Sequence, residues 1–167
     1  YGTYDNIKAA FRRFIDNLPF YGFAVLCSDH PAVQGLIPNI VDRRLITYGF
    51  NAQADVRVSN VRPSAEGNLF DVTFADWLND GNEELVIRDI FLPMLGEHNV
   101  LNSLASLAIG QEMGMPVATM KTAMKFESQF KEGHNNKKKE VSKIDIKLYK
   151  SILNEKDLDN LVKIYYI

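Results

Sequence analysis

Residues 22–49 decide the fold, and they read GFAVLCSDHPAVQGLIPNIVDRRLITYG. The run from Phe23 to Cys27 is short, apolar and unbroken, which is typical of a strand covered on both faces in a parallel sheet. Ser28-Asp29-His30-Pro31 has the composition of a helix start, because serine and aspartate cap helices and proline fits the first turn. Leu45–Gly49 is a second apolar run, which a helical crossover would place parallel to the first. The segment therefore predicts an α/β fold.

On the amino side of this segment, apolar residues from Tyr4 to Leu18 recur at helical spacing, and Pro19 stops the pattern. On the carboxyl side, apolar and polar residues alternate strictly, unlike the unbroken apolar runs before them. Turn-forming residues separate the alternating stretches. These hairpins predict a small antiparallel sheet beside the mostly parallel one, with helices completing the fold. We expect strands at residues 56–61, 69–74 and 85–92, and helices at about residues 99–114 and 115–124.

The composition and net charge limit the classes of function that the chain can have. The 167 residues are 46% hydrophobic and 24% charged, with a formal net charge of -2, so the bulk charge gives no reason to expect nucleic acid as a partner. No apolar stretch approaches the roughly 20 residues that span a bilayer, so we expect no membrane insertion. The single cysteine, Cys27, lies in the first apolar run and reads as a small buried hydrophobe in a reducing compartment, which favours the cytoplasm.

The chain divides by composition near residue 125. We predict one α/β domain over residues 1–125, a polar and charged linker over residues 126–143, and a divergent helical tail over residues 144–167. This helical tail ends in apolar residues, which makes it a candidate surface for self-association or a cap on the sheet. An off-frame or fused tail without an evolved role is an alternative that the sequence leaves open.

The most informative motif is Gly96-Glu97-His98-Asn99-Val100-Leu101-Asn102 at the start of the expected helix. Asn99 and Asn102 stand three residues apart and so share one helix face. Their amides offer both a donor and an acceptor, which match the exocyclic amine and ring nitrogen of adenine. The alternative is structural: Asn99 caps the helix and His98 satisfies a buried carbonyl. A weaker candidate is Asp29-His30 as an acid–base pair, for which helix capping is the competing interpretation.

Four segments resemble, in the same order, segments of the Mur ligases, in particular the branch that adds L-alanine. They are Tyr1–Tyr4, Phe14–Gly22, Ile46–Gly49 and Gly96–Asn102. The resemblance implies that residues 1–125 are part of the family's central ATP-binding domain. It also implies that Asn99 and Asn102 contact adenine with His98 beside them. By the same analogy, Tyr21 and Gly22 line the cleft for the sugar nucleotide.

The resemblance further implies a full-length enzyme that uses ATP and Mg²⁺ to join L-alanine to UDP-N-acetylmuramate through an acyl phosphate, in peptidoglycan precursor synthesis. This sequence departs from the family pattern. It contains no Gly-Lys-Thr or Gly-Lys-Ser phosphate loop, the family's metal-binding histidine would precede Tyr1, and Glu97 stands where the family usually has arginine.

We therefore expect a fragment that is inactive alone, holds no catalytic or metal-binding residue of its own and binds adenine nucleotide weakly at most. The alternative is a non-catalytic nucleotide-binding or interaction domain derived from that ligase.

Overall fold

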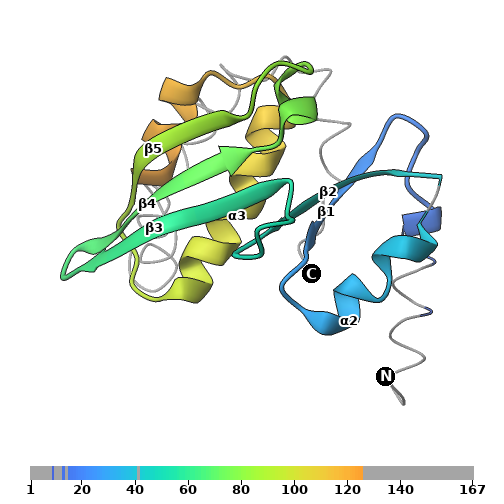
Figure 1. The fold of residues 1–167 in the computed structure, drawn as a ribbon, viewed down its shortest axis with the longest axis horizontal. Helices are drawn as coiled ribbons and strands as arrows, with labels where there is room; N and C mark the ends of the chain where they lie inside the picture. The colour runs from blue at the N-terminus through green and yellow to red at the C-terminus, as the bar shows by residue number, and fades with distance from the viewer. Residues whose placement is uncertain (1–8, 10–12, 14, 41, 126–167) are drawn as a thin grey trace, which may run out of the picture.

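The computed structural model describes residues 9, 13, 15–40 and 42–125, and its secondary structure follows the order expected from the sequence (Figure 1). A further helical stretch covers residues 117–125. The named elements are β1 (Phe23–Cys27), α2 (Pro31–Gln34), the 3-10 helix η1 (Ile37–Asn39), β2 (Arg44–Gly49), β3 (Val56–Ser64), β4 (Gly67–Phe74), the 3-10 helix η2 (Asp76–Asn79), β5 (Leu85–Leu92) and α3 (Glu97–Glu112).

Across the described residues, the strands form one five-stranded sheet in the order β1-β2-β3-β4-β5. The pairs β1–β2 and β2–β3 are parallel, whereas β3–β4 and β4–β5 are antiparallel. The predicted α/β class, the parallel pairing of the two apolar runs and the antiparallel hairpins are all confirmed. The antiparallel strands do not form a sheet of their own, because β3 pairs with β2 as well as with β4 and so extends the parallel part.

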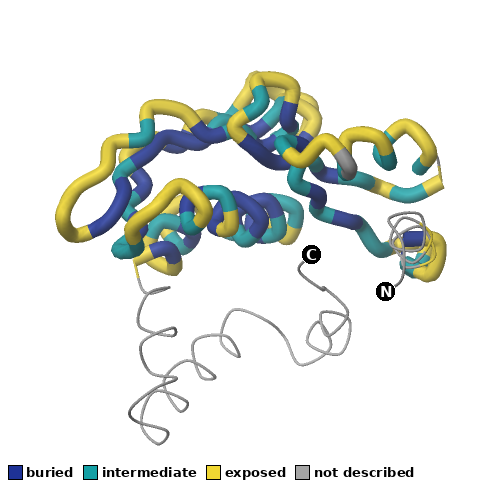
Figure 2. Tube along the Cα trace, turned by 90° about the horizontal axis from the view of Figure 1, so that it is seen from below, coloured by how far each residue is buried: buried dark blue, intermediate teal, exposed yellow. Residues whose placement is uncertain are grey.

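The core lies mainly between the sheet and α3. Figure 2 shows buried positions along the strands and along α3, and the buried side chains of both belong to one cluster. Alternation places every second strand residue on this face, and the fully buried side chains include Ile46, Phe70, Phe74 and Leu104. A second, smaller core forms on the other face of β1 and β2 around Ile15. Because β1 is covered on both faces, its sequence is apolar at every position, whereas β2 also contains the exposed Arg44 and the half-buried Thr47.

Small residues on α3 permit the close packing that the sequence predicted. Ala105 and Ala108 are buried in the main core, and Gly110 faces the following helical stretch. A Cβ atom at Gly110 would lie 3.0 Å from the Met120 sulfur, so the absence of a side chain there lets the two helices approach. Cys27 is a free, half-buried thiol packed against the same core, in partial agreement with the buried position expected for it.

Several predictions fall outside the described residues. Most of the helix expected over residues 4–18 is among them, although residues 15–16 are helical. The linker predicted for residues 126–143 and the tail predicted for residues 144–167 also lie outside the described part. Within that part, no helix has the length and apolar character needed to cross a membrane.

Candidate functional site

The predicted asparagine motif lies on the first turns of α3. Gly96 is the N-cap residue, with a φ of 90°, and the helix begins at Glu97, two residues earlier than the sequence pattern indicated. The backbone angle favours glycine there, and a Cβ at Gly96 would lie 2.9 Å from the imidazole of His98, so this exposed ring would have to move. His98 and Asn102 are exposed, and Asn99 is half-buried. The three predicted residues therefore occupy one accessible end of the helix.

Hydrogen bonds orient Asn99 against the loop before the helix. Its side-chain Nδ2 donates to the Leu95 carbonyl at 2.7 Å, and its backbone N–H donates to the Gly96 carbonyl at 3.2 Å. The capping role considered for Asn99 is wrong, because Gly96 occupies the N-cap position. The alternative for His98 is also wrong in its premise, since this side chain is exposed rather than placed at a buried carbonyl. Asn99 instead reaches back across the start of the helix.

A buried asparagine fixes the same loop from the other side. Asn68, only 2% exposed, lies in β4 directly opposite Leu92 at the end of β5. Its Nδ2 donates to the Met94 carbonyl at 2.6 Å. This residue was not predicted from the sequence. The available signal was its position two residues before Phe70, on the inward face of an alternating strand, where an apolar side chain is the norm.

Gly67 allows this close approach of β4 to the end of β5. Its φ is 150°, and a Cβ there would lie 2.2 Å from the Leu92 carbonyl oxygen and 2.8 Å from the Pro93 Cα. These neighbours are backbone atoms, which cannot swing away as a flexible side chain could. The hairpin end that contains Gly67 and the loop that leads into α3 are thus packed together (Figure 1).

Asp29 joins the carboxyl ends of β1 and β2. Its two carboxylate oxygens accept hydrogen bonds from the backbone N–H groups of Phe50, at 2.7 Å, and Asn51, at 3.0 Å. These bonds tie the segment after β1 to the loop after β2. Asp29 therefore acts as a link between two loops, and neither the acid–base pairing with His30 nor capping of the short helix describes these contacts. In open α/β sheets, the carboxyl ends of parallel strands are the usual ligand-binding edge.

Tyr21 and Gly22 lie at the opposite end of the sheet from the asparagine motif. They directly precede Phe23, which is paired with Arg44 at the amino ends of β1 and β2. The Arg44 guanidinium forms an ion pair with Glu112 at 2.8 Å, so this end of the sheet meets the last residue of α3. Asn99 and Glu112 are 13 residues apart in the helix, or about 20 Å at 1.5 Å per residue. The structure does not bring the two predicted groups together.

Tyr21 is 65% exposed and packs edge-to-face with the neighbouring Phe20 at a ring-centroid distance of 5.1 Å. Gly22 closes a turn by donating from its backbone N–H to the Pro19 carbonyl at 2.9 Å. A Cβ at Gly22 would lie 3.2 Å from that carbonyl oxygen, which gives the glycine a local steric reason. Both residues thus shape the entry into β1.

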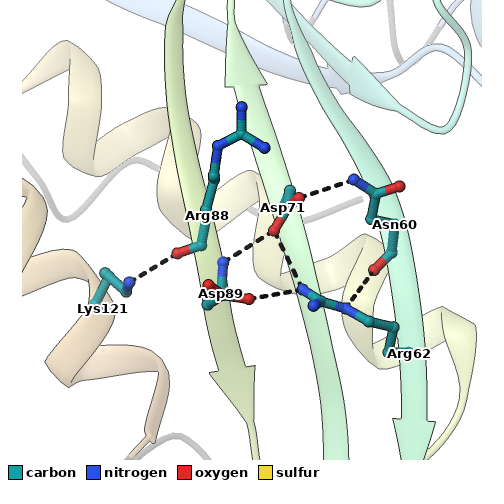
Figure 3. A network of polar contacts seen from close by, with 6 residues as sticks. All are labelled: Asn60, Arg62, Asp71, Arg88, Asp89 and Lys121. Atoms are coloured by element: carbon teal, nitrogen blue, oxygen red, sulfur yellow. Dashed lines mark hydrogen bonds and ion pairs between the residues drawn. The ribbon is translucent and has the colours of Figure 1, made fainter.

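A polar network holds the outer part of the sheet, where β3 and β4 each change register (Figure 3). The buried Asp71 carboxylate accepts hydrogen bonds from the Asn60 amide at 2.9 Å and from the Asp89 backbone N–H at 2.9 Å. Arg62 forms ion pairs with Asp71 at 3.3 Å and with Asp89 at 2.9 Å. The Asn60 hydrogen bond, followed by the Asp89 backbone bond, lowers the pKa of Asp71 because both stabilise the carboxylate against the cost of burial.

The network stabilises backbone that would otherwise be unfavourable. Asn60 and Asp89 have φ values of 50° and 56°, in the left-handed region that costs most side chains energy. On the far side of β5, the Lys121 ammonium donates to the Arg88 carbonyl at 2.7 Å (Figure 3). These contacts are structural: they link β3, β4 and β5 to one another and β5 to the helical stretch over residues 117–125.

The residues present fit the adenine end of a nucleotide better than its phosphate end. Two asparagine amides on adjacent turns can recognise a base edge, and the helix N-terminus supplies partial positive charge. Among the described residues, no three or more histidine, cysteine, aspartate or glutamate side chains are arranged to hold a metal ion. The hydrogen-bonding groups at this end of α3 are therefore side-chain amides and the backbone N–H groups of the helix N-terminus.

The family model described as the Mur ligase middle domain matches residues 1–110. This chain belongs to the Mur ligase family. A relative from Maricaulis maris named UDP-N-acetylmuramate--L-alanine ligase is 55% identical over 124 residues, covering 74% of this chain and 26% of the relative. A Paramagnetospirillum magneticum protein of the same name is 49% identical over 124 residues, covering 74% and 26% of the two chains.

Solved Mur ligase structures share the fold. A crystal structure of MurF from Acinetobacter baumannii aligns with a TM-score of 0.58 at 18% identity, covering 74% of this chain and 25% of that one. A UDP-N-acetylmuramoyl-L-alanyl-D-glutamate--2,6-diaminopimelate ligase aligns with a TM-score of 0.57 at 20% identity, covering 74% and 24%. The chain thus spans about a quarter of the length of the Mur ligases it matches.

Proposed function

We propose that this chain supplies the adenine-binding side of a nucleotide site in a ligase that adds L-alanine to UDP-N-acetylmuramate for peptidoglycan precursor synthesis. The observation that carries the proposal is the pair Asn99 and Asn102 on the accessible first turns of α3. The names of the relatives that are 46–55% identical support the choice of alanine ligase within the family.

The groups that the chain contains determine which part of the nucleotide it binds in this proposal. Asn99 and Asn102 bind the base, while the Gly96 turn exposes the positive end of α3 to the nucleotide. ATP, with Mg²⁺, supplies the phosphoryl group that activates the substrate carboxylate in the full-length ligase. A phosphate loop with its lysine is the usual device for holding the β- and γ-phosphates, and the sequence has none. The chain alone is therefore inactive, and it works in the cytoplasm as part of the larger enzyme.

Binding of ADP to the purified chain, measured by isothermal titration calorimetry, tests the site. Each base-directed hydrogen bond contributes roughly 0.5–1.5 kcal/mol, so Asn99→Ala and Asn102→Ala should each weaken binding about two- to tenfold. Asn39→Ala is the matched control, because the Asn39 amide also donates to a carbonyl four residues earlier, that of Gly35, but lies in η1. Equal affinity of the parent and both α3 variants for ADP would reject the site.

A second experiment tests the inactivity. The chain is incubated with ATP, Mg²⁺, UDP-N-acetylmuramate and L-alanine, and phosphate release is followed. The expected result is no release above the protein-free background. Sustained turnover would contradict the proposal that the phosphate-transfer residues lie elsewhere in the full-length enzyme.

A further inference from the structure

We propose that Asn68 is a positioning residue for the nucleotide site, setting the orientation of Asn99 through the loop before α3. The inference rests on the proposed adenine-binding role of Asn99 and extends it to a residue on a different element. Asn68 lies in β4, whereas the motif lies at the start of α3, about 30 residues later in the chain.

Asn68 places a polar side chain in the core. Asn68 is 2% exposed and points toward the core, where an unpaired amide would lose its hydrogen bonds to water without replacement. Its Nδ2 replaces them by donating to the Met94 carbonyl at 2.6 Å. An apolar residue would fill the same space without this bond. The amide therefore has a definite partner, and that partner belongs to the loop between β5 and α3.

The next carbonyl along the loop is held by the motif itself. The carbonyl after that of Met94 belongs to Leu95, and it accepts the Asn99 side chain at 2.7 Å. Consecutive carbonyls are thus held by Asn68 from the sheet and by Asn99 from the helix. The two carbonyls belong to successive rigid peptide planes that meet at the Leu95 Cα, so a displacement of the Met94 plane that moves this Cα also moves the Leu95 carbonyl. The Asn99 side-chain amide would then lose the carbonyl that fixes its orientation.

The rest of the loop before α3 is also held in place near Met94. Met94 packs its side chain against the main core, and its backbone N–H donates to the Leu92 carbonyl at 2.8 Å. Gly67 brings β4 close enough for Asn68 to reach across. The hairpin end of β4 is therefore packed against the loop that leads into the motif. A hydrophobic contact alone would not require a buried amide at this position.

The test compares Asn68→Ala with the parent chain by two readouts. The first is the side-chain amide signal of Asn99 in ¹H–¹⁵N NMR spectra, assigned by its disappearance in Asn99→Ala. The second is the ratio of ADP to GDP affinity, which reports orientation of the base-reading amides and which a general loss of stability would not selectively move. We expect the Asn99 signal to shift and the ADP preference to fall at least threefold, while Asn39→Ala changes neither.

The possible outcomes separate this inference from the proposed function. If the parent chain binds no ADP, the proposed function fails, and the Asn99 amide signal alone decides whether Asn68 positions it. An unchanged Asn99 signal and an unchanged ADP-to-GDP ratio in folded Asn68→Ala would overturn the inference.

Asn68→Ser provides a second variant if Asn68→Ala does not fold. If neither folds, coupling across the hydrogen bond from the Asn68 amide to the Met94 carbonyl is measured in the parent. Its presence supports the inference, and its absence overturns it.

Discussion

Replacing Gly49 by alanine should destabilise the chain through a single contact. A Cβ built at Gly49 would lie 2.3 Å from Oδ1, 2.7 Å from Cγ and 2.9 Å from Oδ2 of Asp29, where ordinary contacts begin at about 3.4 Å. The added methyl group therefore has to displace the Asp29 carboxylate by roughly 1 Å. That carboxylate already accepts hydrogen bonds from Phe50 and Asn51, and a shift of this size breaks both.

The magnitude follows from the two lost bonds. A hydrogen bond to a charged group contributes roughly 1.5–3 kcal/mol, and exposure of the Phe50 bond places the pair near the lower end of that range. Gly49→Ala should therefore lower the free energy of unfolding by about 2–4 kcal/mol. Asp29→Ala should lower it by a similar amount, because it removes the same acceptor.

Urea unfolding followed by circular dichroism measures both variants and the double variant Asp29→Ala/Gly49→Ala. Without the carboxylate, the methyl group has room, so the double variant should be about as stable as Asp29→Ala alone. The expected coupling energy is then about 2 kcal/mol or more. Additive losses from the two single variants would refute the reasoning, because they would show that Gly49 is required for some reason other than the Asp29 carboxylate.

Three further predictions concern the core and the polar contacts of the sheet. The lowered pKa of Asp71 means that its stabilising contribution is present above its ordinary value of 3.8 and is lost as the pH falls through the lower folded value. The difference in unfolding free energy between the parent and Asp71→Asn should therefore shrink below about pH 4, and a constant difference would contradict this. Leu104→Ala should cost about 2–5 kcal/mol by chemical denaturation, because the side chain is fully buried. Trp77→Phe removes the 3.0 Å bond from the indole N–H to Asp55 at an exposed site and should cost less than about 1.5 kcal/mol in the same assay.

The sequence was sufficient for the elements whose periodicity is strong. The unbroken apolar run at Phe23–Cys27 predicted a strand with two covered faces, and the structure places a core on each side of it. Alternation predicted β3, β4 and β5, because one face of each packs toward α3. Local pattern could not show that the hairpins continue the parallel sheet, because a connection as short as residues 50–55 ordinarily indicates an antiparallel hairpin, whereas β2 and β3 pair in parallel.

The candidate site was predictable only in its local part. Spacing placed Asn99 and Asn102 on one helix face, and the helix in the structure has them on its first turns. The backbone angle of Gly96, which starts the helix at Glu97, is not visible in apolar spacing. Asn68 could not be linked to the motif from spacing, because its partner at Met94 is 26 residues away. The separation of Tyr21 from Asn99 depends on the direction in which α3 crosses the sheet.

The strand order has a consequence for how the chain folds. Among the described elements, each strand pairs with the one next to it in sequence. Closing a short loop costs less chain entropy than closing a long one, so the β3–β4 and β4–β5 hairpins can form early and at low cost. The β1–β2 pair must wait for its crossover segment to be placed. We therefore expect the antiparallel half to protect its backbone amides from hydrogen exchange first during refolding, with the parallel half assembling onto it.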